Sequence, residues 1–304
     1  MLTALARWRR AGGPGLSGAI VLLAGVLVHT RTAQEDDLAA TLDRAAGRVE
    51  DFFTRAQSLV CTETVVIQPL NWGLAGDGPG RTVESELRLS WAPGADGDAA
   101  TEAQTMRQVV KVNGRRPREN DRNNCTTPEQ NDTETQILSM LLPSQRDDYS
   151  WKLAGRGKVD GRDTIQIDFR ERAEITVDVR LVEDNEDCVS YDLNGGMRGR
   201  IWVDVETYDV LRVDQHLKGF VDVPLPRELT RRHGVPPFWT MERFDTSYRF
   251  KRLRFDDPEE SIVLPVSSTT LRVTRGAGMP RSRVSTQYKQ YRRFLTGGRI
   301  VPPQ

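Results

Sequence analysis

The side chains that could carry acid–base or nucleophilic chemistry in this chain are few and far apart. Two of the three histidines, His216 and His233, lie in the body of the sequence, and neither has the spacing of a pair of metal ligands. No serine lies between glycines as in a nucleophile elbow, and no glycine-rich phosphate loop follows a predicted strand. We therefore expect no cofactor, no metal site and no enzymatic activity.

Three carboxylates provide the main alternative to this interpretation. Asp168, Asp178 and Asp204 alternate with apolar residues along predicted strands. A pair of carboxylates on adjacent strands could act as acid and base in a hydrolase. Each of the three also lies on the polar side of its strand, beside other charged residues, which favours a solvated outer face.

The three cysteines bear on the redox compartment. Cys125 and Cys188 each lie in a polar stretch, and in an oxidising compartment we expect a disulfide between them. Cys61 follows Leu59 and Val60, which favours a buried thiol that behaves as a small apolar side chain. The three cysteines lack the paired spacing of a zinc site.

The N-terminal segment differs in composition from the rest of the chain. Three arginines within the first ten residues precede an apolar run over residues 16–28, and an acidic stretch follows Ala33. This order predicts a signal peptide over residues 1–33, and we expect residues 34–304 to be exported to the periplasm or cell envelope. The apolar run is shorter than the ~20 residues that span a bilayer, but Arg31 fits a cleavage site poorly, so an uncleaved membrane anchor stays open.

The overall charge excludes one class of partner. The chain has 43 basic and 43 acidic residues among 304, so no net field attracts nucleic acid or anionic lipid. The hydrophobic content of 38% is ordinary for a globular protein. We expect no nucleic-acid partner.

Short alternating segments dominate the sequence after the N-terminus. Leu87, Leu89 and Trp91 alternate with polar residues, and Ile165 and Ile167 repeat the same period of two. Strands are predicted at residues 61–68, 82–91, 105–113, 149–155, 163–170, 175–182, 200–205, 210–216, 246–253, 262–273 and 284–294. Such strands form an antiparallel sheet with one apolar face, which must be covered by a helix, a second sheet or a bound apolar molecule.

Two helices are expected as covers. Apolar residues recur three or four positions apart over residues 36–58 and predict one amphipathic helix. Thr127 and Pro128 suit the start of a second helix, which Pro143 would stop. This helical insertion is a candidate lid.

A proline-rich segment over residues 223–239 is too long for a hairpin turn. Phe238 and Trp239 at its end could form an apolar mouth to the sheet. Alternatively, they anchor the loop to the core.

The stretch Gly199-Arg200-Ile201-Trp202-Val203-Asp204-Val205-Glu206-Thr207-Tyr208-Asp209-Val210-Leu211-Arg212-Val213 resembles a hairpin of the LolA/LolB-like family of periplasmic lipoprotein carriers and their lipid-binding relatives. Val159-Asp160-Gly161-Arg162-Asp163 is similar to a preceding turn of that family. The resemblance implies an α+β fold, with a strongly curved antiparallel sheet that forms an unclosed β-barrel. An N-terminal helix and a helical insertion would cover its concave face, which would accept acyl chains.

These observations lead to one preferred hypothesis and two alternatives. We expect an exported, non-enzymatic protein with a single LolA-like domain, holding a lipid or a lipidated protein against Leu87, Leu89, Trp91, Phe238 and Trp239. The first alternative is an envelope protein-interaction or sensor module whose core is filled by its own side chains. The second is the carboxylate-based hydrolase.

Overall fold

The computed structural model describes residues 20–56, 59–91, 103–122, 136–182, 185–256, 259–276 and 281–293. The chain divides into two units, Met1–Ala40 and Thr41–Gln304. In the first unit, residues 20–40 form the beginning of helix α1 (Ile20–Arg55). Over the described part of the chain, no helix has the length and apolar character needed to cross a membrane.

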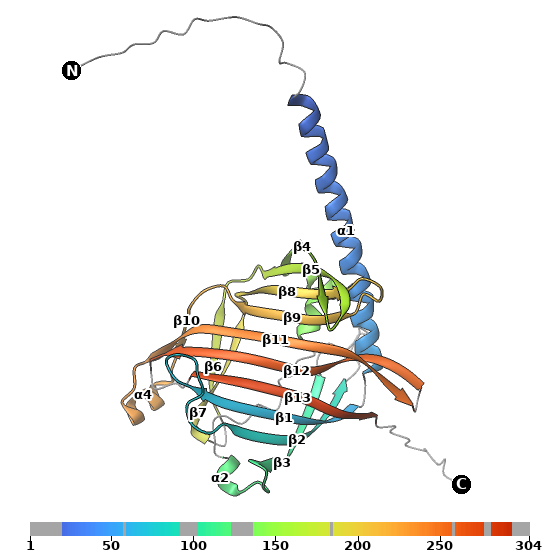
Figure 1. The fold of residues 1–304 in the computed structure, drawn as a ribbon. Coiled ribbons are helices and arrows are strands. Elements are labelled where there is room, and N and C mark those ends of the chain that lie inside the picture. Colours follow the sequence, from blue (N-terminus) through green and yellow to red (C-terminus); the bar gives the residue numbers. More distant parts are fainter. Residues whose placement is uncertain are drawn as a thin grey trace, which may run out of the picture. The chain divides into compact units, whose positions relative to one another are not determined.

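The second unit is built on one antiparallel sheet. Its strands are β1 (Leu59–Leu70), β2 (Arg81–Trp91), β3 (Ala103–Val112), β4 (Tyr149–Val159), β5 (Arg162–Glu171), β8 (Met197–Asp204), β9 (Val210–Leu217), β10 (Val221–Pro224), β11 (Phe238–Asp256), β12 (Glu259–Arg275) and β13 (Arg281–Arg293). The strand order is β3-β2-β1-β13-β12-β11-β9-β8-β5-β4, and β10 extends the line of β9 along β11 (Figure 1). The order ends at β3 and β4, so the predicted unclosed antiparallel sheet is confirmed.

The sheet separates an inner face, which carries most of its buried side chains, from an outer face. Along β1, Leu59, Cys61, Val65 and Ile67 are buried on the inner face, while Val66 is exposed on the outer one. This period of two follows from the pleat, which points successive side chains to opposite faces.

Helix α1 contributes to the core through its second half. From Thr41 onward, its buried residues recur three or four positions apart: Leu42, Ala45, Ala46, Val49, Phe52 and Phe53. The predicted amphipathic N-terminal helix is therefore confirmed, although it continues to Arg55 only.

A separate β-hairpin covers one end of the inner face. Strands β6 (Thr176–Val182) and β7 (Asn185–Asn194) form a two-stranded sheet of their own and cross behind the long strands in Figure 1. Their apolar side chains pack on the core cluster formed by Leu217, Val221, Val223, Trp239 and Met241. The polar stretch around Cys188 is thus a strand, which the sequence pattern did not predict.

The expected helical insertion is not confirmed. Thr127 and Pro128 lie outside the described residues, and the next described element is a short 3₁₀ helix, η1 (Gln136–Leu141). Pro143 does not simply stop a helix, because it begins the short helix α3 (Pro143–Arg146). Its missing N–H is no loss at a first helical position.

The second unit contains two more short helices. Helix α2 (Glu119–Arg122) follows β3, and α4 (Arg227–His233) lies within the proline-rich segment. That segment is therefore not a loop throughout, since β10 and α4 occupy much of it. Gly234 ends α4 with a φ of 61°, a left-handed conformation that glycine adopts without strain.

Candidate ligand-binding site

The candidate site is the inner face of the sheet together with the two segments that cover it, the second half of α1 and the β6–β7 hairpin. The predicted ligand-binding residues fall into two groups on this face. Leu87 and Leu89 are buried on β2, at 2% and 3% exposure, and Leu89 lies opposite Leu59 at the start of β1. Trp239 is 1% exposed at the start of β11, which is the opposite end of the sheet.

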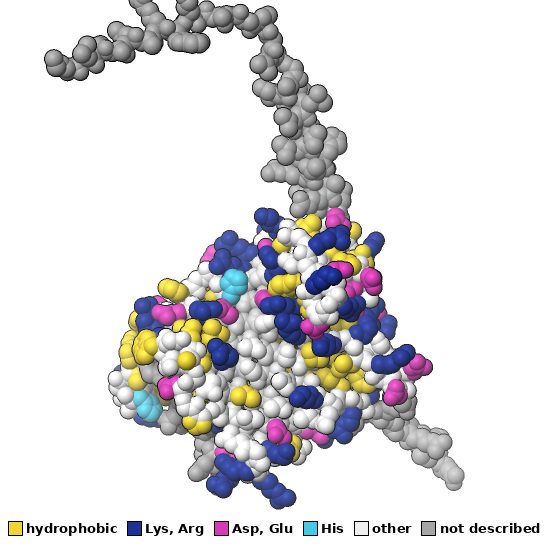
Figure 2. All heavy atoms as spheres, in the orientation of Figure 1, with side chains coloured by type: hydrophobic (Ala, Val, Ile, Leu, Met, Phe, Trp, Pro, Cys, Tyr) yellow, Lys and Arg dark blue, Asp and Glu magenta, His cyan; other side chains and the backbone are white. Residues whose placement is uncertain are grey.

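The remaining two predicted residues do not join either group. Phe238 is 47% exposed, and it neighbours the buried Trp239 on one strand, so the two side chains point to opposite faces. Hydrophobic side chains gather at this end of the outer face, whereas acidic and basic ones are interspersed elsewhere (Figure 2). Trp91 is the last residue of β2, and its side chain lies outside the described part of the structure.

Between the two apolar ends, the inner face is polar. Thr246, Ser268 and Thr286 are buried on neighbouring strands, and Thr246 shares a hydrogen bond of 3.1 Å with Thr270. Gln215 Nε2 donates to the Tyr248 hydroxyl at 3.4 Å. The face therefore offers hydrogen-bonding groups as well as apolar surface.

A buried ion pair lies at the β1–β2–β3 edge of the inner face. Arg107 Nε donates to Glu63 Oε2 at 2.9 Å, and Arg107 Nη2 donates to Glu63 Oε1 at 3.2 Å. The side chains are only 7% and 1% exposed. Such a fork-to-fork geometry is the strong form of a charge-assisted hydrogen bond.

At the hairpin end, an arginine enters the apolar cluster. Arg272 of β12 places its guanidinium carbon 5.5 Å from the centre of the Tyr191 ring and 5.7 Å from that of Phe244. Tyr191 in turn meets Trp239 edge to face, with ring centres 5.2 Å apart. Sequence reasoning missed Arg272, because Leu271 and Val273 on either side look like the inward residues of that strand.

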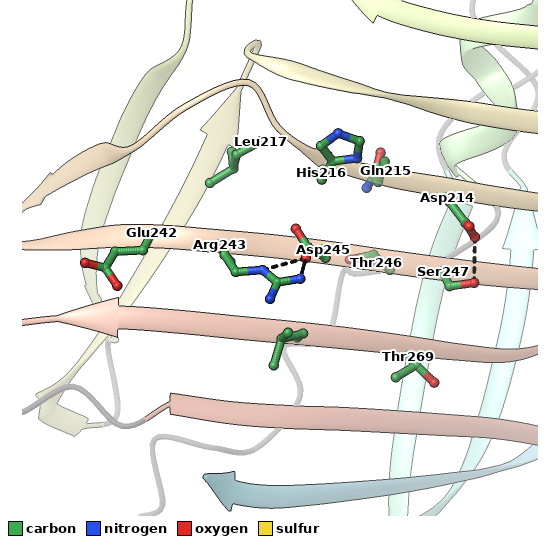
Figure 3. A pocket seen from close by; sticks show the side chains of 11 residues that line it. Asp214, Gln215, His216, Leu217, Glu242, Arg243, Asp245, Thr246, Ser247 and Thr269 are labelled. Atoms are coloured by element: carbon green, nitrogen blue, oxygen red, sulfur yellow. Dashed lines mark hydrogen bonds and ion pairs between the residues drawn. The ribbon is translucent and has the colours of Figure 1, made fainter. Parts of the chain in front are cut away.

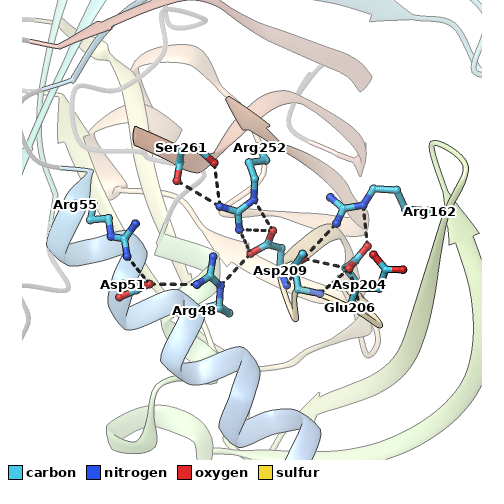
Figure 4. A network of polar contacts seen from close by, with 10 residues as sticks. Arg48, Asp51, Arg55, Arg162, Asp204, Glu206, Asp209, Arg252 and Ser261 are labelled. Atoms are coloured by element: carbon cyan, nitrogen blue, oxygen red, sulfur yellow. Dashed lines mark hydrogen bonds and ion pairs between the residues drawn. The ribbon is translucent and has the colours of Figure 1, made fainter. Parts of the chain in front are cut away.

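The turn between β8 and β9, within the hairpin of residues 199–213, holds helix α1 to the sheet through side-chain contacts (Figure 4). Asp209 has a side chain only 1% exposed and accepts from Arg252 Nε at 3.0 Å and from Arg48 Nε of α1 at 3.2 Å. Arg48 also pairs with Asp51, and Arg55 pairs with the same Asp51 at 3.0 Å. This network, which we call the Asp209 clamp (Arg48, Asp209 and Arg252), joins the helix, the β8–β9 turn and β11.

Asp204 is structural rather than solvated, which corrects our expectation for it. Its Oδ1 accepts from the backbone N–H groups of Glu206 and Thr207 at 3.0 and 2.8 Å, and its Oδ2 pairs with Arg162 at 2.8 Å. Burial alone would raise the pKa of Asp204, but these hydrogen bonds and Arg162 favour the carboxylate more strongly and lower it.

The other two candidate carboxylates do not meet in a cleft. Asp168 of β5 accepts from Arg200 Nε at 2.6 Å, and that pair raises the pKa of Arg200. Asp178 is exposed on β6, in the separate hairpin. Within the described residues, no cluster of three or more His, Cys, Asp or Glu could hold a metal ion.

A crevice of about 640 Å³ opens on the outer face where β9 leaves β11 (Figure 3). Its charged groups already have partners: Arg243 Nε donates to Asp245 at 2.8 Å, and Asp214 accepts from Arg212 and from Ser247. His216 lies at its rim, while His233 is exposed on α4. The crevice thus offers no acid–base pair aimed at a common point.

Two of the three cysteines, Cys61 and Cys188, lie among the described residues. Cys61 carries a buried thiol on the inner face of β1, as expected. Cys188 is buried on β7, at 4% exposure. Cys125 lies outside the described residues, so the Cys125–Cys188 disulfide stays a prediction.

No family model matches the chain, and no curated protein matches it in sequence. Three solved structures are similar to it in fold. A DUF1329 family protein from Desulfovibrio piger has a TM-score of 0.42 and 12% identity, over 85% of this chain and 94% of that one. An outer membrane lipoprotein-sorting protein domain from Vibrio parahaemolyticus has a TM-score of 0.40 and 11% identity, over 84% and 92%. A LolA superfamily protein from Nitrosomonas europaea has a TM-score of 0.34 and 7% identity, over 88% and 97%.

These similarities concern the fold alone.

Proposed function

We propose that this chain is an exported, non-enzymatic binding protein that holds the apolar part of a lipid or of a lipidated protein beneath its two covers. The observation that carries the proposal is how the covers are attached. The β6–β7 hairpin is outside the hydrogen-bonded ladder of the main sheet, and helix α1 is fastened through side chains of the Asp209 clamp. Either cover can withdraw while the sheet keeps its own hydrogen bonds.

The apolar surface beneath the covers would supply the affinity. Each buried CH₂ contributes about 0.8 kcal/mol, so an acyl chain of about ten carbons would gain about 8 kcal/mol before the costs of binding. A net free energy of about 8 kcal/mol would correspond to a Kd of about 1 μM, and the costs of binding make the expected Kd weaker than this. Head-group selectivity must then come from the polar groups of the inner face.

The test is binding of a fluorescent fatty-acyl probe to the delipidated protein. We expect saturable binding that phospholipid displaces, and native mass spectrometry of the protein before delipidation should reveal a bound lipid. A folded, delipidated sample that shows no saturable binding would end the carrier proposal.

A substitution on the inner face distinguishes a face that is occupied by a ligand from a face that is packed by the protein's own side chains. Leu89→Trp should weaken probe binding more than it lowers stability if ligand occupies this end of the inner face. If the face is a solid core, the same change overpacks it and costs about 1–3 kcal/mol of folding free energy with no binding to lose. Val66→Trp, on the outer face of the neighbouring strand, is the matched control because Val66 is already 36% exposed.

One observation favours a second function, an envelope protein-interaction module. Strand β3 is an edge of the sheet, and Met106 and Val110 on it are 63% and 49% exposed. The unpaired backbone groups of an edge strand can bind a strand of a partner, and exposed apolar side chains on that edge can contact it. If the probe does not bind, photo-crosslinking from position 106 would test this function directly.

A further inference from the structure

The hairpin end of the inner face contains a cation with which no described carboxylate pairs. Arg272 lies between the sheet and the β6–β7 hairpin, and its Nε is buried with no hydrogen-bond acceptor among the described residues. The rings of Tyr191 and Phe244 that flank its guanidinium attract a cation, but a ring face is a weak substitute for an oxygen acceptor.

A second buried donor lies against the same tyrosine ring. The indole Nε1–H of Trp239 is buried and also has no acceptor in the described part of the chain, although Trp239 is only 1% exposed. Its ring meets Tyr191 at an interplanar angle of 76°. Trp239 and Arg272, each with a buried donor that has no acceptor among the described residues, therefore both contact the Tyr191 ring.

Buried donors without acceptors are unfavourable, and most proteins avoid them. Two of them on one ring would both be satisfied by a ligand that brings anionic oxygens to this place. Hydroxyl groups are also at hand, since Thr270 and Ser282 flank this part of the inner face and Ser282 is opposite Arg272.

We propose that Arg272 and the Trp239 indole bind the anionic oxygen group of the ligand, a carboxylate or a phosphate, beneath the β6–β7 hairpin. This inference rests on the proposed function and adds the polar head to it: the acyl chain lies along the apolar surface while the head is held at the hairpin end. Arginine is suited to this role because its planar fork matches the geometry of both anions.

The two ends of the β6–β7 hairpin lie close together. Gly195 and Gly196 connect β7 to β8 with φ values of 79° and 75°. A Cβ at Gly195 would lie 2.5 Å from the Glu174 carbonyl oxygen, and one at Gly196 would lie 2.6 Å from the Ile175 Cβ. The two glycines thus allow the chain that leaves β7 to pass close to the residues that enter β6, which gives the hairpin a narrow base.

The experiment compares ligands that differ only in the anion. For the carboxylate, the delipidated protein is titrated with oleic acid and with methyl oleate; for the phosphate, it is titrated with phosphatidic acid and with the matching diacylglycerol. We expect the wild type to bind at least one anionic member about tenfold more tightly than its neutral counterpart, and the pair that shows the preference identifies the anion.

Arg272→Met keeps an apolar stem and removes the guanidinium. We expect it to abolish the preference for the anion, to leave binding of the neutral member unchanged, and to leave the unfolding midpoint equal or higher. Trp239→Phe keeps the ring and removes the N–H, so it should reduce the preference by a smaller factor. Arg275→Met is the matched control on the same strand, because Arg275 is exposed and pairs with Glu242.

The outcomes separate this inference from the proposed function. Equal binding of anionic and neutral members by the wild type overturns the inference and leaves the carrier function standing. A preference that survives in Arg272→Met also overturns it. A lower unfolding midpoint for Arg272→Met with the preference unchanged would show that the arginine serves packing alone. If no member binds, both proposals fail.

Discussion

The Glu63–Arg107 pair shows how a charge can occupy the interior of this protein. The side chains of Arg107 and Glu63 are only 7% and 1% exposed, so water does not solvate their charges. Each charge is compensated by the opposite charge of its partner. The exposed Arg88–Glu86 pair one strand away has the same chemistry, but its side chains are 48% and 32% exposed. Burial, rather than the presence of an ion pair, decides what the pair contributes.

We therefore expect Glu63→Gln to lower the free energy of unfolding by about 3–5 kcal/mol, because it leaves Arg107 buried without its anion. Glu86→Gln, the matched control, should change it by less than about 1 kcal/mol. Urea unfolding followed by circular dichroism measures both. Equal effects of the two substitutions would contradict the burial of the Glu63 pair.

Asp204 predicts a specific response to acid. Its pKa in the folded protein lies below the ordinary value of 3.8, so the carboxylate contributes stability above that pH. The contribution is lost as the pH falls below 3.8 and through the lowered pKa. Asp204→Asn cannot ionise, so its unfolding free energy should fall less steeply than that of the wild type over this range. Parallel pH profiles for the two proteins would refute the assignment.

At the scale of elements, the two covers differ in how they are held. The hairpin depends on apolar contacts with the Trp239 cluster, whereas α1 combines an apolar stripe with polar fastening. Arg48 and Arg55 both pair with Asp51, yet only Arg48 also reaches the Asp209 clamp. Substituting Arg48 therefore removes a contact between α1 and the sheet, whereas substituting Arg55 removes only a charge from the helix.

Arg48→Met should speed association of the acyl probe about tenfold, because the lost hydrogen bond to the Asp209 carboxylate contributes about 1.5 kcal/mol to closure of α1. Arg55→Met should leave the association rate unchanged. Stopped-flow fluorescence with equal probe concentrations measures the rates. If the two variants associate at the same rate, α1 does not limit ligand entry.

The sequence predicts the strands better than it predicts the inner face. Alternating apolar residues such as Leu87 and Leu89 locate their strand and its buried side, because one face of that strand meets the core. On β12 the same reasoning fails, since Arg272 faces inward and Leu271 lines the outer crevice. The rings of Tyr191 and Phe244 cover Arg272, so the apolar alternation of Leu271 and Val273 indicates the wrong face of β12.

The candidate site was harder to predict for a related reason. Phe238 and Trp239 are both aromatic, but adjacent strand residues cannot line one site, and only Trp239 belongs to the interior. The hairpin strand β7 was missed because its first residues are polar, while Tyr191 and Leu193 further along it make the contact. Nothing in a single sequence pairs Tyr191 with Arg272 across two sheets.

At the scale of the whole molecule, the Cys125–Cys188 disulfide stays a prediction. A Cys125–Cys188 disulfide would tie the hairpin to the segment before η1 and, by loop-closure entropy, would stabilise the protein by about 4 kcal/mol. We expect labelling without denaturant to leave all three cysteines unmodified. Reduction should then expose Cys125 and Cys188 and lower the unfolding midpoint. Labelling of Cys125 before reduction would contradict the link.

The pairing of β1 with β13 has a consequence for how the protein is made. Thr62 and Gln290, which share a hydrogen bond of 3.0 Å across these strands, are 228 positions apart in the chain. While the polypeptide emerges from the ribosome, β1 can pair with β2 but must wait for β13, so one edge of β1 stays open until β13 has been made. An open strand edge aggregates readily. The same delay keeps the nascent chain from folding early, which would suit the export that we propose.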